Sequence, residues 1–255
     1  MSRLRQLILL TAVIAAFLAA GPAAAAPPET LTPVPGVNIN VSQPGSPAEM
    51  VKTVQIFIFL TILSLLPAFL VMVTSFTRIV IVLSFLRTAL GAQQAPPNMV
   101  LVGLALFLTF FIMAPVYNEI NEQALKPFVE NRITLETAQE RAAAPLREFM
   151  LKQTRDKDLE LFVKMAKIQK PDKESLPITV VAPAFVTSEL RTAFQMGFLL
   201  YLPFLVIDMV VASILMSLGM FMVPPVMMSL PFKILLFVLV DGWYLVVKSL
   251  VESFA

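Results

Sequence analysis

Apolar residues fill two long blocks of the chain, and a charged segment separates them. The first block is an uncharged run over residues 53–77 that continues past Arg78 to Arg87 and resumes over residues 100–116. The second block begins near Met196. A helix that crosses a membrane needs about 20 apolar residues. The pattern therefore predicts an all-α protein with about four hydrophobic, membrane-type helices.

Proline interrupts the first block twice. Pro67 is expected to kink the first helix, because a proline inside a helix removes a backbone hydrogen bond. The sequence AQQAPPN at 92–98 predicts a turn, in which Asn98 is a suitable N-cap for the next helix. Residues 53–116 are therefore predicted to form a first hydrophobic helical hairpin.

The second block contains one strong helix break. A helix is expected from about residue 196 to 221, and Pro224-Pro225 stops it because proline disfavours helix in the residue before it. The last hydrophobic helix is expected at about 231–251. Residues 192–255 are therefore predicted to form a second hairpin around the proline pair.

The segment between the blocks, residues 117–191, holds 12 acidic and 12 basic residues, most of the charge of the chain. Its apolar residues recur at helical spacing, at Leu146, Phe149 and Met150 and again at Leu159, Phe162, Val163 and Ala166. The pattern predicts a small helical domain in water. The evenly mixed charges favour contacts with neighbouring protein over capture of one kind of ligand.

The beginning of the sequence is typical of a secretory signal peptide. Two arginines precede an apolar core at 7–20, which is short for a membrane span, and small residues follow it. We expect a signal peptide at 1–25 with cleavage after Ala25; an uncleaved anchor helix is the weaker alternative. Residues 26–52 contain six prolines and predict a flexible leader.

The orientation in the membrane follows from the predicted leader. If the mature N-terminus lies outside, the turns at 88–98 and 222–232 lie inside and the domain at 117–191 lies outside. Arg87 and Lys233 flank the inner turns, as the positive-inside rule expects.

Composition excludes several kinds of function. The 255 residues contain no cysteine and no histidine. This excludes disulfides, zinc sites built on Cys or His, cysteine nucleophiles and catalytic relays that need histidine. The formal net charge of +2 gives no indication of nucleic-acid binding. The sequence predicts no cofactor and no metal.

Four charged residues stand inside apolar helices: Arg78, Asp208, Lys233 and Asp241. An aspartate at the centre of a span costs about 2.5–3.5 kcal/mol on insertion scales. The simplest interpretation is that these residues form structural pairs or assembly contacts inside a helical bundle. Two alternatives are a proton or ion pathway, as in an ion-coupled transporter, and an intramembrane aspartyl protease that uses Asp208 and Asp241.

Methionines gather around the proline pair, at Met220, Met222, Met227 and Met228. Flexible thioethers are common fillers of irregular apolar cores. They also suit a deformable constriction, formed by Met220, Phe221 and Met222 at the helix break of Pro224 and Pro225. Composition alone leaves both interpretations open.

Long segments of the sequence resemble the FliP/SctR family of type III secretion export-gate proteins. The segments are SFTRIVIVLSFLRTALG (75–91), APPNMVLVGLALFLTFFIMAPV (95–116), PAFVTSELRTAFQMGF (183–198), PFLVIDMVVASILMSLGMFMVPP (203–225) and LPFKILLFVLVDGW (230–243). Together with the leader, they favour a flagellar member over an injectisome member of the family.

The resemblance implies a channel subunit of the bacterial inner membrane at the flagellar basal body, not an enzyme. Such subunits form a ring, expected to be a pentamer, which with FliQ and FliR makes the export gate. FlhA, FlhB and an ATPase complex energise passage of unfolded rod, hook and filament subunits. Met220 and Met222 correspond to the methionine gasket of the family, and Phe221 stands where relatives more often have a third methionine. The resemblance also implies that the apolar helices face neighbouring protein as well as membrane lipid in the finished gate.

Overall fold

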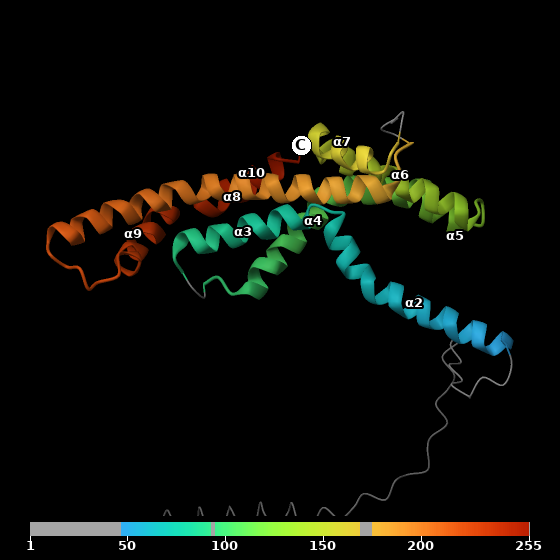
Figure 1. Ribbon diagram of the computed structural model, residues 1–255, viewed down its shortest axis with the longest axis horizontal. Helices are drawn as coiled ribbons and strands as arrows, with labels where there is room; N and C mark the ends of the chain where they lie inside the picture. The colour runs from blue at the N-terminus through green and yellow to red at the C-terminus, as the bar shows by residue number, and fades with distance from the viewer. Residues whose placement is uncertain (1–46, 93–94, 169–174, 255) are drawn as a thin grey trace, which may run out of the picture. The chain divides into compact units, whose positions relative to one another are not determined.

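A computed structural model describes residues 47–92, 95–168 and 175–254, and all regular elements in these ranges are helices (Figure 1). In order they are α2 (Pro47–Met72), α3 (Phe76–Leu90), α4 (Asn98–Ile120), the π-helix η1 (Asn121–Leu125), α5 (Lys126–Val129), α6 (Leu135–Gln153), α7 (Asp156–Met165), α8 (Ile178–Ser217), α9 (Pro225–Leu239) and α10 (Gly242–Glu252). This confirms the predicted all-α fold class.

Residues 1–54 and 55–255 form two separate units, and the packing described below lies in the second. The predicted signal peptide, its cleavage after Ala25 and most of the predicted leader lie outside the described residues. The last residues of that leader are helical, because α2 begins at Pro47.

The first predicted helix is two helices. We expected one helix from 53 to 87 with a kink at Pro67, whereas α2 continues through Pro67 and ends at Met72. The polar side chains after Met72 bind the backbone in place of a helical partner: Thr77 Oγ1 donates to Val71 O at 3.1 Å. Such local bonds compete with helix continuation, which accounts for the break before α3.

Helix α8 is the long shared element of the fold. It runs without interruption through 40 residues, including Pro183 and Pro203, so the start predicted near residue 196 is wrong. The boundary expected between residues 191 and 192 falls inside this helix. Its first half packs against α6 and α7, and its second half packs against α9. The charged segment and the second hairpin therefore share one helix.

Two clusters of buried apolar side chains hold the described helices together. The larger cluster joins α3, α4, α8, α9 and α10; the smaller one joins the α2–α3 junction, α6, α7 and α8. Met150, Leu159 and Val163 lie in the smaller cluster, as their spacing predicted, whereas Ala166 is exposed.

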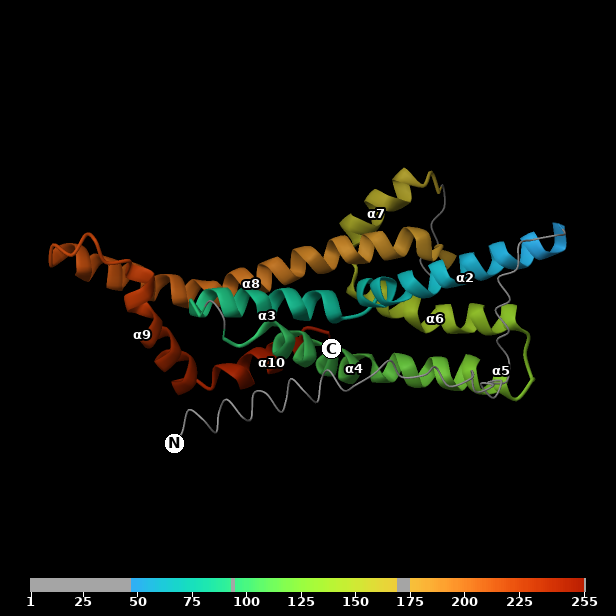
Figure 2. The same cartoon turned by 90° about the horizontal axis from the view of Figure 1, so that it is seen from below.

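The most extensive helix contact joins α3 and α8, which lie side by side in Figure 2. At Gly197, a Cβ atom would come within 2.6 Å of the Phe85 ring. This distance is far inside van der Waals contact. Glycine is therefore required at this position for α8 to approach α3 so closely.

The last predicted helix is also two helices. We expected one helix over 231–251 with Asp241 near its middle, but α9 and α10 meet at a bend of 65°. Asp241 occupies the bend in the left-handed conformation, with φ of +50°. A Cβ at Gly242 would lie 2.2 Å from the Phe237 ring, so glycine lets the two helices fold tightly at this point.

Two of the described helical runs are long and apolar enough to cross a membrane, namely Asn98–Val129 and Ile178–Ser217. The bent pair α9 and α10 makes a third candidate if both helices form one span, and Thr53–Phe69 is a shorter apolar helix. The first of these runs is longer than the predicted 100–116, because η1 and α5 continue α4. It starts directly after Pro97, so Asn98 is the first helical residue and not the N-cap.

Candidate functional site

Arg78 is the centre of a buried polar cluster. It is 2% exposed, and its Nε donates to Glu189 Oε2 at 2.9 Å while Nη2 binds Glu189 Oε1. The Nη1 group donates to Ser253 O at 2.7 Å and to Ser253 Oγ at 3.0 Å, and Nη2 donates to Gln153 Oε1 at 3.0 Å. The Phe254 ring covers the guanidinium at 3.8 Å. These five residues, called the Arg78 cluster below, join α3, α6, α8 and the segment after α10.

The geometry of the Arg78 cluster accounts for its burial. A buried charge is tolerated when a counter-ion and hydrogen bonds replace its water. The fork of Arg78 meets the Glu189 carboxylate on two atoms, which is the strongest arrangement for this pair. The remaining donors point to oxygen acceptors from two other segments. The cluster is therefore a structural junction inside one chain.

A second polar cluster joins α8 to α9. Lys233 Nζ donates to Asp208 Oδ2 at 2.6 Å, and Ser229 Oγ donates to Asp208 Oδ1. The Lys233 side chain is 2% exposed and the Asp208 side chain 16%. The Lys233 ammonium also lies near Gly91, at the C-terminal end of α3, where a cation is favoured. We call Asp208, Ser229 and Lys233 the Lys233 cluster.

The Lys233 cluster corrects one part of the orientation argument. Lys233 was expected to flank an inner turn as a positive charge, and the structure buries it beside Asp208. Lys233 therefore serves as the counter-ion of Asp208 between the helices. Of the two residues used to predict the orientation, only Arg87 still supports it. The interpretation of Asp208 and Lys233 as a structural pair agrees with this geometry.

Asp241 differs from Asp208 in its exposure and in its bonding partners. Its side chain is exposed at the bend between α9 and α10, and it has no ion-pair or hydrogen-bond partner among the described residues. Asp208, in contrast, is bound to Lys233 and Ser229. An aspartyl protease needs two carboxyl groups that share a proton. The two aspartates have no such common environment here.

The residues of the predicted constriction lie in the loop between α8 and α9. We expected the helix to reach Phe221, but it ends at Ser217 because Gly219 takes the left-handed conformation, with φ of +76°. Met220 N donates to Leu215 O at 2.9 Å and Gly219 N donates to Met216 O at 3.1 Å. This is the bond pattern of a Schellman helix end.

The side chains of this loop are open to the surroundings. Met220 is 42% exposed, Phe221 77% and Met222 94%. Pro224 precedes the first residue of α9, Pro225, so the proline pair begins α9 and does not end α8 as we expected. The loop forms an apolar tip at the end of the α8–α9 hairpin. A contiguous apolar surface of this kind marks a site of contact with other molecules.

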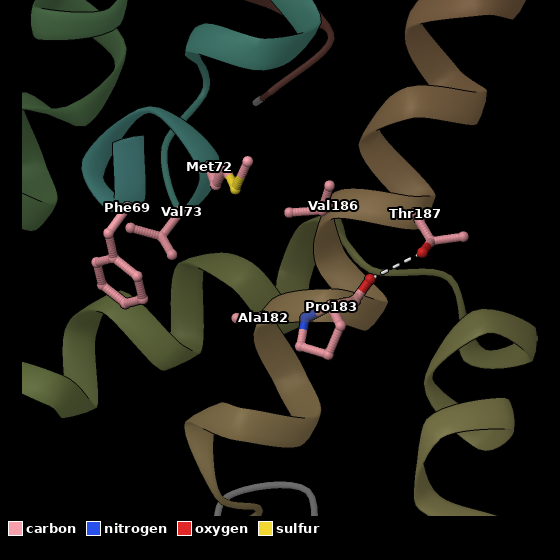
Figure 3. A pocket seen from close by; sticks show the side chains of 7 residues that line it. All are labelled: Phe69, Met72, Val73, Ala182, Pro183, Val186 and Thr187. Carbon is pink, nitrogen blue, oxygen red and sulfur yellow. Dashed lines mark hydrogen bonds between the residues drawn. The ribbon is translucent and has the colours of Figure 1, made fainter. Parts of the chain in front are cut away.

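A separate apolar pocket of about 370 Å³ lies between the end of α2 and the first half of α8 (Figure 3). Its lining residues are Phe69, Met72, Val73, Ala182, Pro183, Val186 and Thr187. The Thr187 hydroxyl donates to Pro183 O within its own helix. Within the described ranges, no group of His, Cys, Asp or Glu side chains could hold a metal ion.

Sequence reasoning missed Glu189, the counter-ion of Arg78, because its charge was counted with the polar segment. The sequence contains one relevant signal, since Glu189 stands in the mostly apolar stretch PAFVTSELRTAFQMGF. It also missed Gln153, Ser253 and Phe254. Their roles depend on contacts between distant segments, and no local pattern indicates them.

These features define an all-α protein with membrane-type helices, buried structural ion pairs and an apolar tip. A model of the FliP family matches residues 59–250, and the chain belongs to this family. It is 58% identical over 217 residues to the flagellar biosynthetic protein FliP of Bacillus subtilis, an alignment that covers 85% of this chain and 98% of the relative.

The FliP proteins of two other bacteria agree with this result. The protein of Pectobacterium carotovorum is 54% identical, with 89% of this chain and 88% of the relative covered. That of Aquifex aeolicus is 51% identical, with 87% and 92% covered. The predicted role in flagellar protein export is confirmed, and the protease and transporter alternatives are not favoured. The chain is a component of the flagellar export apparatus.

Proposed function

We propose that this chain is a non-enzymatic, channel-forming core subunit of the flagellar export gate. In this proposal several copies, five by resemblance to the family, surround a channel in the bacterial inner membrane. FliQ and FliR complete the gate, and FlhA and FlhB act beside it. Unfolded rod, hook and filament subunits pass through the channel. The domain of α5, α6 and α7 lies on the periplasmic side, where its mixed charges brace neighbouring copies.

The observation that carries the proposal is the apolar surface that the fold leaves uncovered. Large side chains on α4, α8 and α9 are more than half exposed, among them Phe107 at 77%, Phe198 at 59% and Leu239 at 73%. At the same time the two ion-pair clusters are satisfied inside the chain. The surface left for lipid and neighbouring protein is therefore apolar, which suits helix packing in an assembly.

Loss of the chain is expected to abolish export. A bacterium that lacks it should build no filament and secrete no hook or filament subunits, and the intact sequence supplied from a plasmid should restore both. Swimming motility and immunoblots of the culture medium measure the result. Normal secretion by the deletion strain would contradict the proposal.

The constriction is proposed to be formed by the loop at the α8–α9 tip. Met220→Ala together with Met222→Ala removes two flexible apolar side chains from this loop, so the closed assembly should leak ions. Conductance of the assembled gate in planar bilayers measures the leak. Met227→Ala, at a methionine that is 67% exposed on α9 outside the loop, is the matched control.

Phe221 gives a second comparison at the same loop. Phe221→Met is expected to keep the closed assembly tight, because methionine is apolar and more flexible than phenylalanine. Unchanged conductance in the double alanine variant would show that Met220 and Met222 do not form the seal.

A further inference from the structure

The α9–α10 arm, residues 225–254, packs on the larger apolar cluster through Phe237, Val246 and Leu250, and polar contacts attach it near both of its ends. Close to its start, Lys233 and Ser229 bind Asp208 of α8. At its other end, the residues after α10 belong to the Arg78 cluster. Between these attachments the apex at Val238–Asp241 is exposed, with Leu239 at 73%.

The bend in the arm has an uncommon backbone conformation. Asp241 takes the left-handed conformation, which strains any residue except glycine, although aspartate adopts it more readily than most residues. Its side chain forms no capping hydrogen bond with α10. One contact that crosses the bend is the edge-to-face packing of Trp243 on Phe237, with ring centroids 5.4 Å apart. Strain of this type persists only where surrounding contacts hold it.

The Arg78 cluster supplies such contacts. The residues beyond α10 contribute two oxygen acceptors from Ser253 and one aromatic ring from Phe254 to the guanidinium. Gln153 Nε2 also donates to Phe254 O at 3.2 Å. If this segment moved away, the buried Arg78 guanidinium would lose three of its contacts, namely two hydrogen-bond acceptors and one aromatic ring. The charge therefore ties the end of the arm to α3, α6 and α8.

We propose that Ser253 and Phe254 are positioning residues that hold the bend between α9 and α10. They fix the far end of the arm on Arg78, and the Lys233 cluster fixes the near end, so the bend at Asp241 and Gly242 keeps its angle. Because α9 directly follows the loop at 218–224, the contacts that position α9 also position this loop. Only this last consequence rests on the proposed function.

The fluorescence of a natural tryptophan can test this proposal. Trp243 is the only tryptophan, and it lies at the bend, 39% exposed. The experiment uses the purified full chain in detergent. It measures the emission wavelength of Trp243 and its quenching by acrylamide, with circular dichroism as the measure of helical content.

Phe254→Ala is expected to shift the Trp243 emission to the red and to increase quenching, while helical content stays the same. Arg78→Lys should produce the same shift, because lysine keeps the charge but loses the planar fork that binds several acceptors and stacks on the ring. Phe254→Tyr retains the ring and should restore the native signal. Phe198→Ala, which removes an exposed ring from α8, is the matched control and should leave Trp243 unchanged.

A chain that ends after Glu252 lacks both positioning residues and should show the largest shift. If this shortened chain unfolds, the proposal is tested with Phe254→Leu instead. Leucine keeps apolar bulk in the site but lacks the aromatic face. A shift in this folded variant supports the proposal. Native emission and quenching in both Phe254→Leu and Phe254→Ala would overturn it. Because the measurement needs no export, this failure is distinct from a failure of the proposed channel function.

Discussion

Arg78→Leu is expected to destabilise the folded chain by about 3–5 kcal/mol, the usual cost of removing one partner from a buried ion pair. The Glu189 carboxylate is 0% exposed and would remain in the core without its counter-ion. Ser253 and Gln153 would lose hydrogen bonds at the same time. Thermal or denaturant unfolding of the purified chain in detergent, followed by circular dichroism, measures the change.

Two controls distinguish the effect of an unpaired buried carboxylate from the general effect of replacing an arginine. Arg132 forms an ion pair with Glu130 in which both side chains are at least half exposed, so Arg132→Leu should cost at most about 1 kcal/mol. The double variant Arg78→Leu with Glu189→Leu should recover part of the loss, because no unpaired charge then remains. A double variant as unstable as Arg78→Leu would show that packing, and not the unpaired carboxylate, causes the loss.

Lys233→Met is expected to have the second largest effect, near the lower end of the same range of about 3–5 kcal/mol. The change leaves the Asp208 carboxylate between α8 and α9 with one hydrogen bond, from Ser229. The cost is smaller than at Arg78 because the Asp208 side chain is 16% exposed and keeps some contact with its surroundings. The same unfolding measurement in detergent applies.

The Lys233 cluster also offers graded comparisons. Ser229→Ala removes one hydrogen bond to a carboxylate and should cost about 1.5–3 kcal/mol, at the lower end of that range because the Asp208 side chain is partly exposed. Adding Asp208→Leu to Lys233→Met should restore part of the stability. A Lys233→Met chain as stable as the parent would mean that the pair contributes nothing to holding the α8–α9 hairpin.

The helices themselves could be predicted well from the sequence. Hydrophobic runs and the spacing of Met150, Leu159 and Val163 indicated helices, because helical periodicity is a local property of the sequence. The sequence placed a break close to the proline pair at 224–225, but Gly219 ends α8 earlier and Pro225 begins α9. Helix breaks without proline were missed. At 73–75 and at Asp241, side-chain bonds and tight packing decide the break, and neither produces a strong sequence signal.

The candidate sites were predicted in part. The sequence singled out Arg78, Asp208 and Lys233, because a charge in an apolar helix is costly wherever it lies. It could not name their partners. Asp208 and Lys233 meet across 25 residues, and Arg78 and Glu189 across 111. Asp241 looked equivalent to Asp208 in the sequence, although the structure exposes it at a bend.

The sequence by itself determined the all-helical class, the membrane-type hydrophobicity, the absence of cysteine and histidine chemistry, and the family of the protein. These follow from composition and from patterns within one or two helical turns. Only the tertiary structure decided that α8 continues through the expected domain boundary, that Lys233 is a buried counter-ion, and that the residues after α10 complete the site of Arg78. Those features depend on which distant segments pack together, and burial then requires each charge to find its partner.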